Sequence, residues 1–295
     1  MNEPVVQIAG LAKAFGQRQV LDHLDLCIPR GAVVGLLGTN GSGKSTLIKC
    51  LLGLLRLSAG SSRVFGDDSW SLNAAAKARL GYVPQDVRLY PWMTASQVIA
   101  YTAAFYPSWD HALTDDLVRR WHVPSNRRIG PFSPGELQKL GLILALGHKP
   151  ELLVLDEPVA SLDPAARRDF LKSLLEVTQD MQHTVLFSTH ITSDLERVAS
   201  HVALLREGRV ALFEELDSVK DRIKRLRIRA AHELPDTFAV AGALHVEVAG
   251  STALVSTTQA SSEMLDELRT RWQADVSVED LNLEDIFLEL NQSSC

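Results

Sequence analysis

The chain has 295 residues, of which 46% are hydrophobic and 22% charged, as in an ordinary globular protein of one large or two unequal domains. The net charge of −6 disfavours nucleic acid as a partner, because nucleic-acid binding usually needs a basic face. Cys27, Cys50 and Cys295 form neither a metal-ligand nor a disulfide pattern, which favours a reducing cytosol. With neither a signal-peptide pattern nor an apolar run long enough to span a bilayer, we expect a soluble chain.

Two β-strands are predicted at the start of the chain, at residues 5–8 and 20–28. Apolar and polar side chains alternate in the second, which is typical of a strand with one buried face. Phe15 lies in the turn predicted between them, at 13–17, and its ring by itself indicates packing in the core or in the turn.

The most informative stretch follows a third predicted strand, the apolar run at 32–37. It matches the phosphate-binding P-loop, G-x-x-x-x-G-K-[ST], and a helical pattern follows at 46–52. The residues of the loop are Gly38, Thr39, Asn40, Gly41, Ser42, Gly43, Lys44, Ser45 and Thr46. The glycines let backbone N–H groups approach phosphate oxygens, Lys44 supplies a positive charge, and the Ser45 hydroxyl can ligate magnesium. The sequence therefore predicts a nucleotide site at a helix N-terminus.

A fourth strand is predicted near residues 80–86, and it ends in a loop with Gln85 exposed. The following segment, 91–123, is mostly helical and contains Trp92, Trp109 and Trp121. These tryptophans fit either a small helical core or a docking surface, where aromatic side chains are over-represented. The sequence supports both interpretations equally.

Several polar residues follow apolar runs or begin helices. Ser133 and Glu136 have the spacing of a helix capping box, a structural role compatible with a functional one. Asp156 and Glu157 follow a buried aliphatic strand at 151–155, at the carboxyl end where ligands bind in open α/β sheets. Asp163 precedes another predicted helix. His190 ends a further buried strand at 184–190, and a histidine there is more often structural or merely exposed than functional.

The composition changes after a hairpin predicted at 202–212. We predict an α/β P-loop core at 1–218, with a helical subdomain at about 86–145, and a small C-terminal α+β domain at 219–295. The predicted elements of that domain are strands at 226–230, 244–256 and 275–278 and helices at 261–272 and 283–290. A basic run from Lys220 to Arg229 fits a solvated strand face or, alternatively, a contact with anionic lipid.

The ordered set of motifs resembles the nucleotide-binding subunit of an ATP-binding cassette (ABC) transporter over residues 5 to about 217. The set comprises the P-loop, Tyr82-Val83-Pro84-Gln85, Ser133-Pro134-Gly135-Glu136, aliphatics-Asp156-Glu157-Pro158, Ser161-Leu162-Asp163 and strand-Thr189-His190. The C-terminal run at 282–290 is similar to a helix of drug- and antibiotic-export subunits. The resemblance implies an ATPase that uses ATP and Mg²⁺. Its implied partners are a second nucleotide-binding subunit, as in a homodimer, and separate integral-membrane subunits at the inner face of the cell membrane, with no nucleic acid.

The resemblance also implies a role for each matching residue. Phe15 would stack on adenine, the P-loop from Gly38 to Thr46 would bind the phosphates, and Ser45, Gln85 and Asp156 would form the magnesium site. Glu157 would polarise the attacking water, assisted by Lys44 and His190 at the γ-phosphate. Residues of the other subunit would complete each site: Ser133, Gly135, Glu136 and Asp163.

The sequence departs from the family pattern in the loop before the predicted helix. Pro134 has no N–H to donate, and Glu136 stands where a glutamine is usual, so an amide donor is lost and a negative charge added. We expect a working ATPase, slower if anything. A soluble ABC ATPase acting on ribosomes or DNA is disfavoured, because the chain has neither a second cassette nor a long coiled-coil insertion. A regulatory ATPase remains the alternative to a transporter subunit. For a transporter, we expect substrate selectivity to lie in the membrane partner.

Overall fold

The computed structural model describes residues 3–160, 162–181, 183–235 and 237–292. It divides into two compact units, Met1–Phe213 and Glu214–Cys295. The first unit contains these elements in chain order: β1 (Val6–Phe15), β2 (Arg18–Ile28), β3 (Val33–Leu37), α1 (Lys44–Leu51), β4 (Ala59–Val64), β5 (Asp67–Asp68), the 3-10 turn η1 (Ser69–Ser71), α2 (Ala74–Lys77), β6 (Leu80–Val83), α3 (Ala95–Ala103), α4 (His111–Arg120), α5 (Pro134–Leu146), β7 (Leu152–Leu155), α6 (Pro164–Met181), β8 (Thr184–Thr189), α7 (Thr192–Val198), β9 (His201–Arg206) and β10 (Arg209–Glu215).

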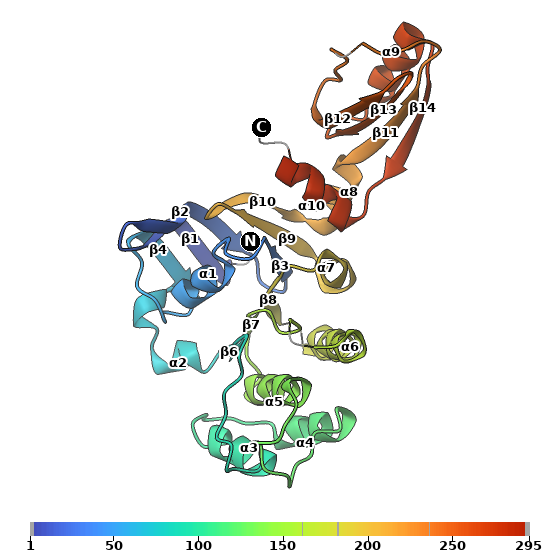
Figure 1. Ribbon diagram of the computed structural model, residues 1–295. Helices are drawn as coiled ribbons and strands as arrows, with labels where there is room; N and C mark the ends of the chain where they lie inside the picture. Colours follow the sequence, from blue (N-terminus) through green and yellow to red (C-terminus); the bar gives the residue numbers. More distant parts are fainter. Residues whose placement is uncertain (1–2, 161, 182, 236, 293–295) are drawn as a thin grey trace. The chain divides into compact units, whose positions relative to one another are not determined.

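A six-stranded sheet forms the centre of the first unit, in the order β10-β9-β3-β8-β7-β6. Strands β6, β7, β8, β3 and β9 pair in parallel, so the ends of β3, β7 and β8 meet at one edge. Every residue of β7 and β8 is buried, as expected for parallel strands covered on both faces. Helix α1 lies on one side of this sheet, and α5, α6 and α7 lie on the other (Figure 1). The predicted α/β class is confirmed.

A second, antiparallel sheet has the order β2-β1-β4-β5. Its buried apolar side chains share one hydrophobic core with α1 and with the central sheet; Leu11, Leu24, Ile48 and Leu186 are among its members. Strand β4 was not predicted, because the run Ala59-Gly60-Ser61-Ser62 has the composition of a loop. Pairing with β1 from Val6↔Val64 onward, and not local propensity, makes this segment a strand.

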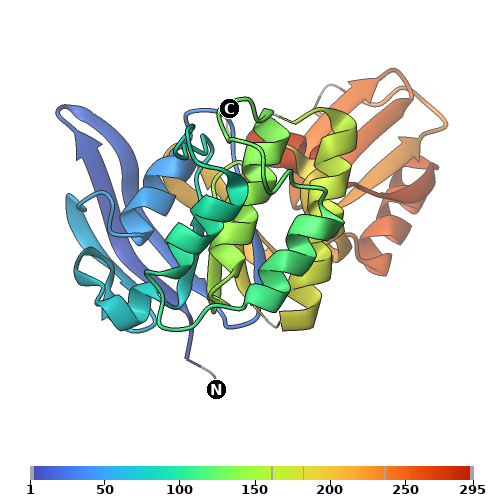
Figure 2. The same cartoon turned by 90° about the horizontal axis from the view of Figure 1, so that it is seen from below.

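Helices α3, α4 and α5 form the helical subdomain, in which α3 and α4 both contact α5 (Figures 1 and 2). The three tryptophans differ in environment here. Trp121 is buried, Trp109 is half-buried beside Tyr106 and His148, and Trp92 is 67% exposed. Trp121 thus belongs to a helical core, whereas Trp92 is available at the surface.

The second unit contains a four-stranded antiparallel sheet in the order β12-β13-β11-β14. Its elements are α8 (Leu216–Arg222), β11 (Lys224–Arg229), β12 (Ala243–Ala249), β13 (Thr252–Thr257), α9 (Ser262–Trp272), β14 (Asp275–Asp280) and α10 (Leu283–Gln292). Apolar residues of the sheet and of α9 form a separate core that includes Leu226, Val255 and Leu268. The predicted single strand at 244–256 is wrong, because Gly250, at φ 62°, allows a turn that divides it into β12 and β13.

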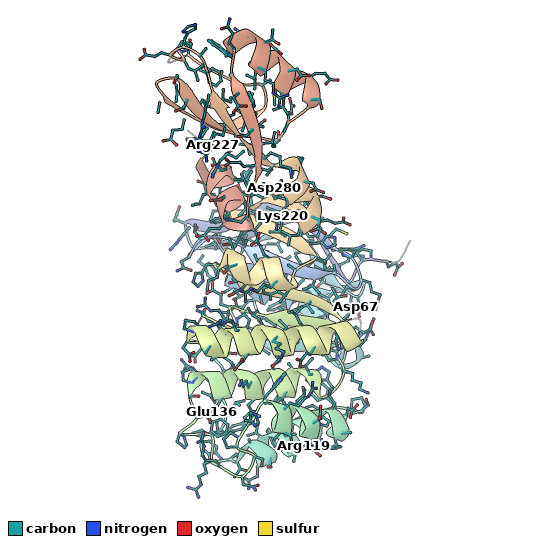
Figure 3. The ribbon with its side chains drawn as sticks, turned by 90° about the vertical axis from the view of Figure 1, so that its right-hand side faces the viewer. Asp67, Arg119, Glu136, Lys220, Arg227 and Asp280 are labelled. Atoms are coloured by element: carbon teal, nitrogen blue, oxygen red, sulfur yellow. The ribbon has the colours of Figure 1, made fainter. Side chains whose placement is uncertain are left out.

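The basic run of the second unit is paired with acidic side chains. Lys224 contacts Asp280 at 2.7 Å, Arg227 contacts Glu279 at 2.7 Å, and Arg225 contacts Glu289 of α10 at 2.9 Å. Figure 3 labels Arg227 and Asp280 in this unit. These pairs favour the strand-face interpretation over the contact with anionic lipid. Helix α10 also contacts β12, so it packs within its own unit.

The predicted domain boundary at 218/219 falls inside α8, a few residues beyond the end of the first compact unit at Phe213. As a boundary between independently folding domains it stays a prediction. Among the described helices, none has the length and hydrophobicity needed to cross a bilayer.

Candidate functional site

A pocket of about 700 Å³ lies beside the ends of β3, β7 and β8, at the N-terminus of α1. It is lined by most of the residues that the sequence proposed and by three that it did not. Predicted residues in the lining are Phe15, Asn40, Gly41, Gly43, Lys44, Ser45, Thr46, Gln85, Glu157 and His190; the others are Arg18, Val20 and Ala160. The fold therefore brings together segments that are far apart in the sequence, from Phe15 to His190.

The loop between β3 and α1 has the backbone conformation that its glycines allow. Gly41 and Gly43 have φ angles of 83° and 108°, in the left-handed region that side chains with a Cβ rarely adopt. A Cβ at Gly43 would also lie 2.8 Å from Leu21. The Ser42 hydroxyl is buried and has no hydrogen-bond partner among the described atoms. A buried polar atom of this kind usually has a partner, so the loop is suited to an anionic ligand.

Lys44 is buried, with 4% of its surface exposed. Its ammonium group donates to the carbonyl oxygens of Gly38 at 2.8 Å and Thr39 at 3.2 Å, and it lies 3.2 Å from Glu157 Oε1. The charge is thus held in the pocket lining by carbonyl oxygens of the loop and by the Glu157 carboxylate. Gly38 and Thr39 act here through their carbonyl groups and do not line the pocket.

Asp156 accepts two hydrogen bonds on its Oδ1 atom. The Ser45 hydroxyl donates at 2.9 Å, and the Ser188 hydroxyl in β8 also donates at 2.9 Å. A serine hydroxyl and a carboxylate next to a phosphate loop are the oxygen donors that Mg²⁺ prefers. The residues present therefore fit a magnesium ion bound by Ser45 and Asp156.

Glu157 has an unusual backbone. Its φ of 45° is in the left-handed region, which costs energy in a residue with a Cβ and is found most often at functional sites. Its N–H donates to the Ser188 hydroxyl at 2.8 Å, and its Oε2 lies 3.1 Å from His190 Nδ1. The carboxylate is thereby held between Lys44 on one oxygen and His190 on the other.

Phe15 and Gln85 both line the pocket. The Phe15 ring is 49% exposed, and the Lys13 ammonium lies 4.7 Å above it, so it is not a core residue. The Gln85 side chain is exposed, while its carbonyl accepts from the buried Gln138 amide of α5 at 2.9 Å. Gln138, missed from the sequence, thus ties the loop after β6 to the helical subdomain.

Some predicted site residues are absent from the described lining of this pocket. Gly38, Thr39, Ser42 and Asp156 belong to the P-loop or directly precede Glu157, whereas four others come from separate segments: Ser133, Gly135, Glu136 and Asp163. Ser133 and Glu136 form a capping box at the start of α5, in a segment that we call the signature loop (132–136). The Asp163 carboxylate accepts from the N–H groups of Ala165 at 2.9 Å and Ala166 at 3.0 Å, and these bonds hold its pKa below the usual range. Ser161, in the same motif, lies outside the described residues.

Ser188 contacts two of the candidate site residues, and the sequence did not indicate it. It bridges Asp156 and the backbone of Glu157, yet in the sequence it is one residue of the strand run Val185-Leu186-Phe187-Ser188. The signal available in the sequence was a serine within a strand predicted to be buried, because a buried hydroxyl needs hydrogen-bond partners. In the structure Ser188 is fully buried. The sequence could not show that both partners would come from the neighbouring strand end.

Comparisons with known proteins agree with this geometry. The family model described as "ABC transporter" matches residues 21–160. An uncharacterized ABC transporter ATP-binding protein of Bacillus subtilis, YdbJ, is 32% identical over 212 residues, which cover 71% of this chain and 69% of that protein. The chain belongs to the ABC transporter ATP-binding proteins.

Two further similarities support this membership. The bacitracin transport ATP-binding protein BcrA of Bacillus licheniformis is 30% identical to this ABC protein over 225 residues, covering 75% of this chain and 73% of the relative. A solved ATP-binding subunit of an ABC transporter has a TM-score of 0.66 and 27% identity, covering 74% of this chain and 92% of that one. The predicted family, fold class and ATPase activity are confirmed.

Proposed function

We propose that this ABC protein is the ATP-hydrolysing subunit of an exporter, and that it works as a dimer with ATP held between two subunits. One observation carries the proposal. Lys44, Ser45, Glu157 and His190 line one pocket, whereas Ser133 and Gly135, the residues expected at the γ-phosphate, lie outside it. A second copy of the chain can supply the missing loop.

The residues of the pocket have distinct tasks in this proposal. The Lys44 ammonium and the backbone N–H groups of the P-loop bind the β- and γ-phosphates, and Phe15 offers its exposed ring to the adenine. Mg²⁺, held by Ser45 and Asp156 with Gln85 nearby, would neutralise charge on the phosphates. Positioning and charge neutralisation are the main requirements of phosphoryl transfer, and these residues supply both.

Glu157 and His190 act on the water that attacks the γ-phosphate. Glu157 Oε2 accepts a proton of that water as its oxygen bonds to phosphorus and the bond to the ADP oxygen breaks. His190, 3.1 Å from the same oxygen, orients the carboxylate and donates to the γ-phosphate. Ser188 fixes the backbone of Glu157. The signature loop and Asp163 of the second subunit close the site from the other side.

An exposed aromatic surface supports assembly with a separate membrane subunit. It consists of Tyr90, Trp92, Tyr101 and Phe105, which are 43%, 67%, 45% and 70% exposed. Each ring contacts at least one other ring of the surface, with centroids 5.1 to 5.7 Å apart. Exposed aromatic patches of this kind mark interaction sites. The proposed occupant is a short cytoplasmic helix of the membrane subunit, which would hold the chain at the inner face of the cell membrane. Export, as the direction of transport, rests on the resemblance of the run at 282–290 to a helix of drug- and antibiotic-export subunits, together with the similarity to BcrA, a bacitracin transport protein.

The decisive experiment uses Glu157→Gln, which keeps the size of the side chain and removes the charge that accepts the proton. We expect this variant to bind MgATP, to hydrolyse it very slowly and to accumulate as a dimer. Size-exclusion chromatography with and without MgATP measures the dimer, and release of phosphate measures turnover. The control is Glu157→Gln/Ser133→Arg, in which a bulky cation at the exposed Ser133 should prevent closure. Dimer formation without nucleotide, or in the Ser133→Arg control, would contradict ATP held between two subunits.

A further inference from the structure

The signature loop of this protein carries a negative charge at a helix N-terminus. Glu136 Oε2 accepts from the N–H of Ser133 at 2.7 Å, and the N–H of Glu136 donates to the Ser133 hydroxyl at 3.2 Å. Pro134, the first residue of α5, has no N–H. The carboxylate thus takes the position at the helix N-terminus where a phosphate would bind most favourably. Without compensation, Glu136 would repel the γ-phosphate that this loop is proposed to contact.

Arg127 provides that compensation. Its guanidinium forms an ion pair with Glu136 Oε1, and it also lies over the ring of the buried Phe132, 4.8 Å from the centroid. Arg127 therefore contacts the signature loop at its first and last residues. Burial raises the pKa of Glu136, but the bonds from Ser133 and Arg127 outweigh it and leave the pKa below the usual range. The carboxylate is charged at neutral pH and needs a cation beside it.

The segment that carries Arg127 is held in place by its own backbone. The N–H of Arg127 donates to Pro124 O at 3.2 Å, and the next residues bond to the segment before α3. Ile129 N–H donates to Met93 O at 2.9 Å, and Gly130 N–H donates to Pro91 O at 3.0 Å. These bonds connect the segment of Arg127 to residues next to the aromatic surface. The position of its backbone therefore does not depend on the signature loop.

The ion pair between Arg119 and Asp116 in the helical subdomain lacks this arrangement. Arg119 pairs with Asp116 at 3.4 Å within α4, as residues i and i+3 of one helix, and 77% of the Arg119 side chain is exposed. In Figure 3 Glu136 lies at the beginning of α5, while Arg119 lies on α4. An exposed ion pair such as Arg119–Asp116 contributes little to stability. It also lies outside the signature loop, which is the segment proposed to contact phosphate. It serves as a matched control for Arg127.

We propose that Arg127 is a positioning residue of the ATP site: it neutralises Glu136 and so allows the acidic signature loop to face the γ-phosphate of the ATP bound by the second subunit. This inference rests on the proposed ATP-dependent dimer. It also accounts for a working site despite the glutamate, because the Arg127–Glu136 pair presents no net charge to the phosphate.

The test measures MgATP-dependent dimerisation in the full chain carrying Glu157→Gln, by light scattering against MgATP concentration. Arg127→Ala should raise the MgATP concentration needed for half-maximal dimer by about tenfold, because an unpaired carboxylate then faces the phosphate. Adding Glu136→Gln to Arg127→Ala should restore this concentration to within about twofold of the parent, since charge and cation are removed together. The amide oxygen introduced by Glu136→Gln can still accept from Ser133 N–H, so the cap is kept. Arg119→Ala should behave as the parent.

A second pair of variants separates charge from packing. Arg127→Lys keeps the charge and Arg127→Gln loses it, while both keep a long side chain near Phe132. We expect the Lys variant to dimerise as the parent and the Gln variant to dimerise as Arg127→Ala. Two results would overturn the proposal if the parent dimerises with MgATP. One is that Arg127→Lys and Arg127→Gln need the same MgATP concentration for half-maximal dimer. The other is that Arg127→Ala/Glu136→Gln needs as much MgATP as Arg127→Ala. A parent that stays monomeric with MgATP would instead contradict the proposed function and this inference with it.

Discussion

The ammonium nitrogen of Lys44 lies 3.2 Å from Oε1 of Glu157, and both side chains are buried. The remaining hydrogen bonds of Lys44 go to Gly38 and Thr39, in the loop that carries it. The lysine proposed to bind phosphate and the glutamate proposed to activate water are therefore direct neighbours. Substitution of either residue by a neutral one leaves the charge of the other uncompensated in the pocket. The effects of the two substitutions on ATP binding and on stability are therefore coupled.

Lys44→Ala should abolish ATP hydrolysis and weaken ATP binding by roughly 30-fold or more, the effect of losing a charged hydrogen bond of about 2 kcal/mol. Calorimetric titration with ATP and a phosphate-release assay measure the two effects. Lys49→Ala, which removes an exposed lysine from the same helix, is the control and should change neither. Unchanged hydrolysis in Lys44→Ala would overturn the assignment of the ATP site.

The low pKa of Glu151 predicts how the stability of the fold depends on pH. Hydrogen bonds from Arg79, assisted by Arg30, lower the pKa of Glu151 from 4.5 to about 2. A carboxyl group whose pKa is lower in the folded state stabilises the fold above its unfolded pKa, and the contribution is lost as pH falls from about 4.5 to about 2.

Glu151→Gln should therefore cost about 1 kcal/mol at pH 7, a value reduced for the partial exposure of the side chain. The difference from the unsubstituted chain should shrink below pH 4.5 and vanish near pH 2. Urea unfolding at a series of pH values measures it. A difference that is constant with pH would show that the arginines do not stabilise the charged form.

The sequence predicts those parts of the site that depend on short, continuous segments. The P-loop and the acids after β7 are of this kind, because a strand end and a helix start determine where the intervening residues lie. Ser188 and the Arg127–Glu136 pair were not predictable, since their partners come from another strand or from across a loop. Strand β4 was missed because its pairing with β1, and not its small polar residues, determines its conformation.

Trp92→Ala should weaken association with the membrane partner without unfolding the chain, because the indole is 67% exposed. The measurement is the fraction of the chain that sediments with native membranes, together with its thermal unfolding. Trp70→Ala is the matched control, since Trp70 is 55% exposed and lies outside the helical subdomain.

Trp121→Ala should destabilise the fold by about 3 kcal/mol or more, as expected for a buried tryptophan. A Trp92→Ala variant that unfolds would contradict the docking surface.

A chain ending at Glu215, the last residue of β10, should fold and bind ATP as the full chain does. The residues that line the pocket proposed to bind ATP lie between Phe15 and His190, within the first compact unit. Calorimetry of ATP binding and cooperative thermal unfolding test this prediction of two domains. An insoluble product would show that the boundary is wrong or that the second unit is required for folding.

Ser188→Ala tests whether the hydroxyl in β8 supports the carboxylates of Asp156 and Glu157, which are proposed to act in ATP hydrolysis. The hydroxyl donates to Asp156 Oδ1 at 2.9 Å and accepts from Glu157 N–H at 2.8 Å, so the substitution leaves both groups without this partner. Because Glu157 is held at φ 45°, a conformation that needs support from its surroundings, its carboxylate should lose its fixed position. We expect kcat to fall about tenfold, with ATP affinity little changed, since Lys44 and the P-loop remain. Stability should fall by about 1 to 2 kcal/mol for the unsatisfied groups. Ser173→Ala, which removes a half-buried hydroxyl from α6, is the control and should leave kcat as it is. If Ser188→Ala lowers stability but keeps full kcat, Ser188 serves the fold alone and Glu157 is positioned by Lys44 and His190.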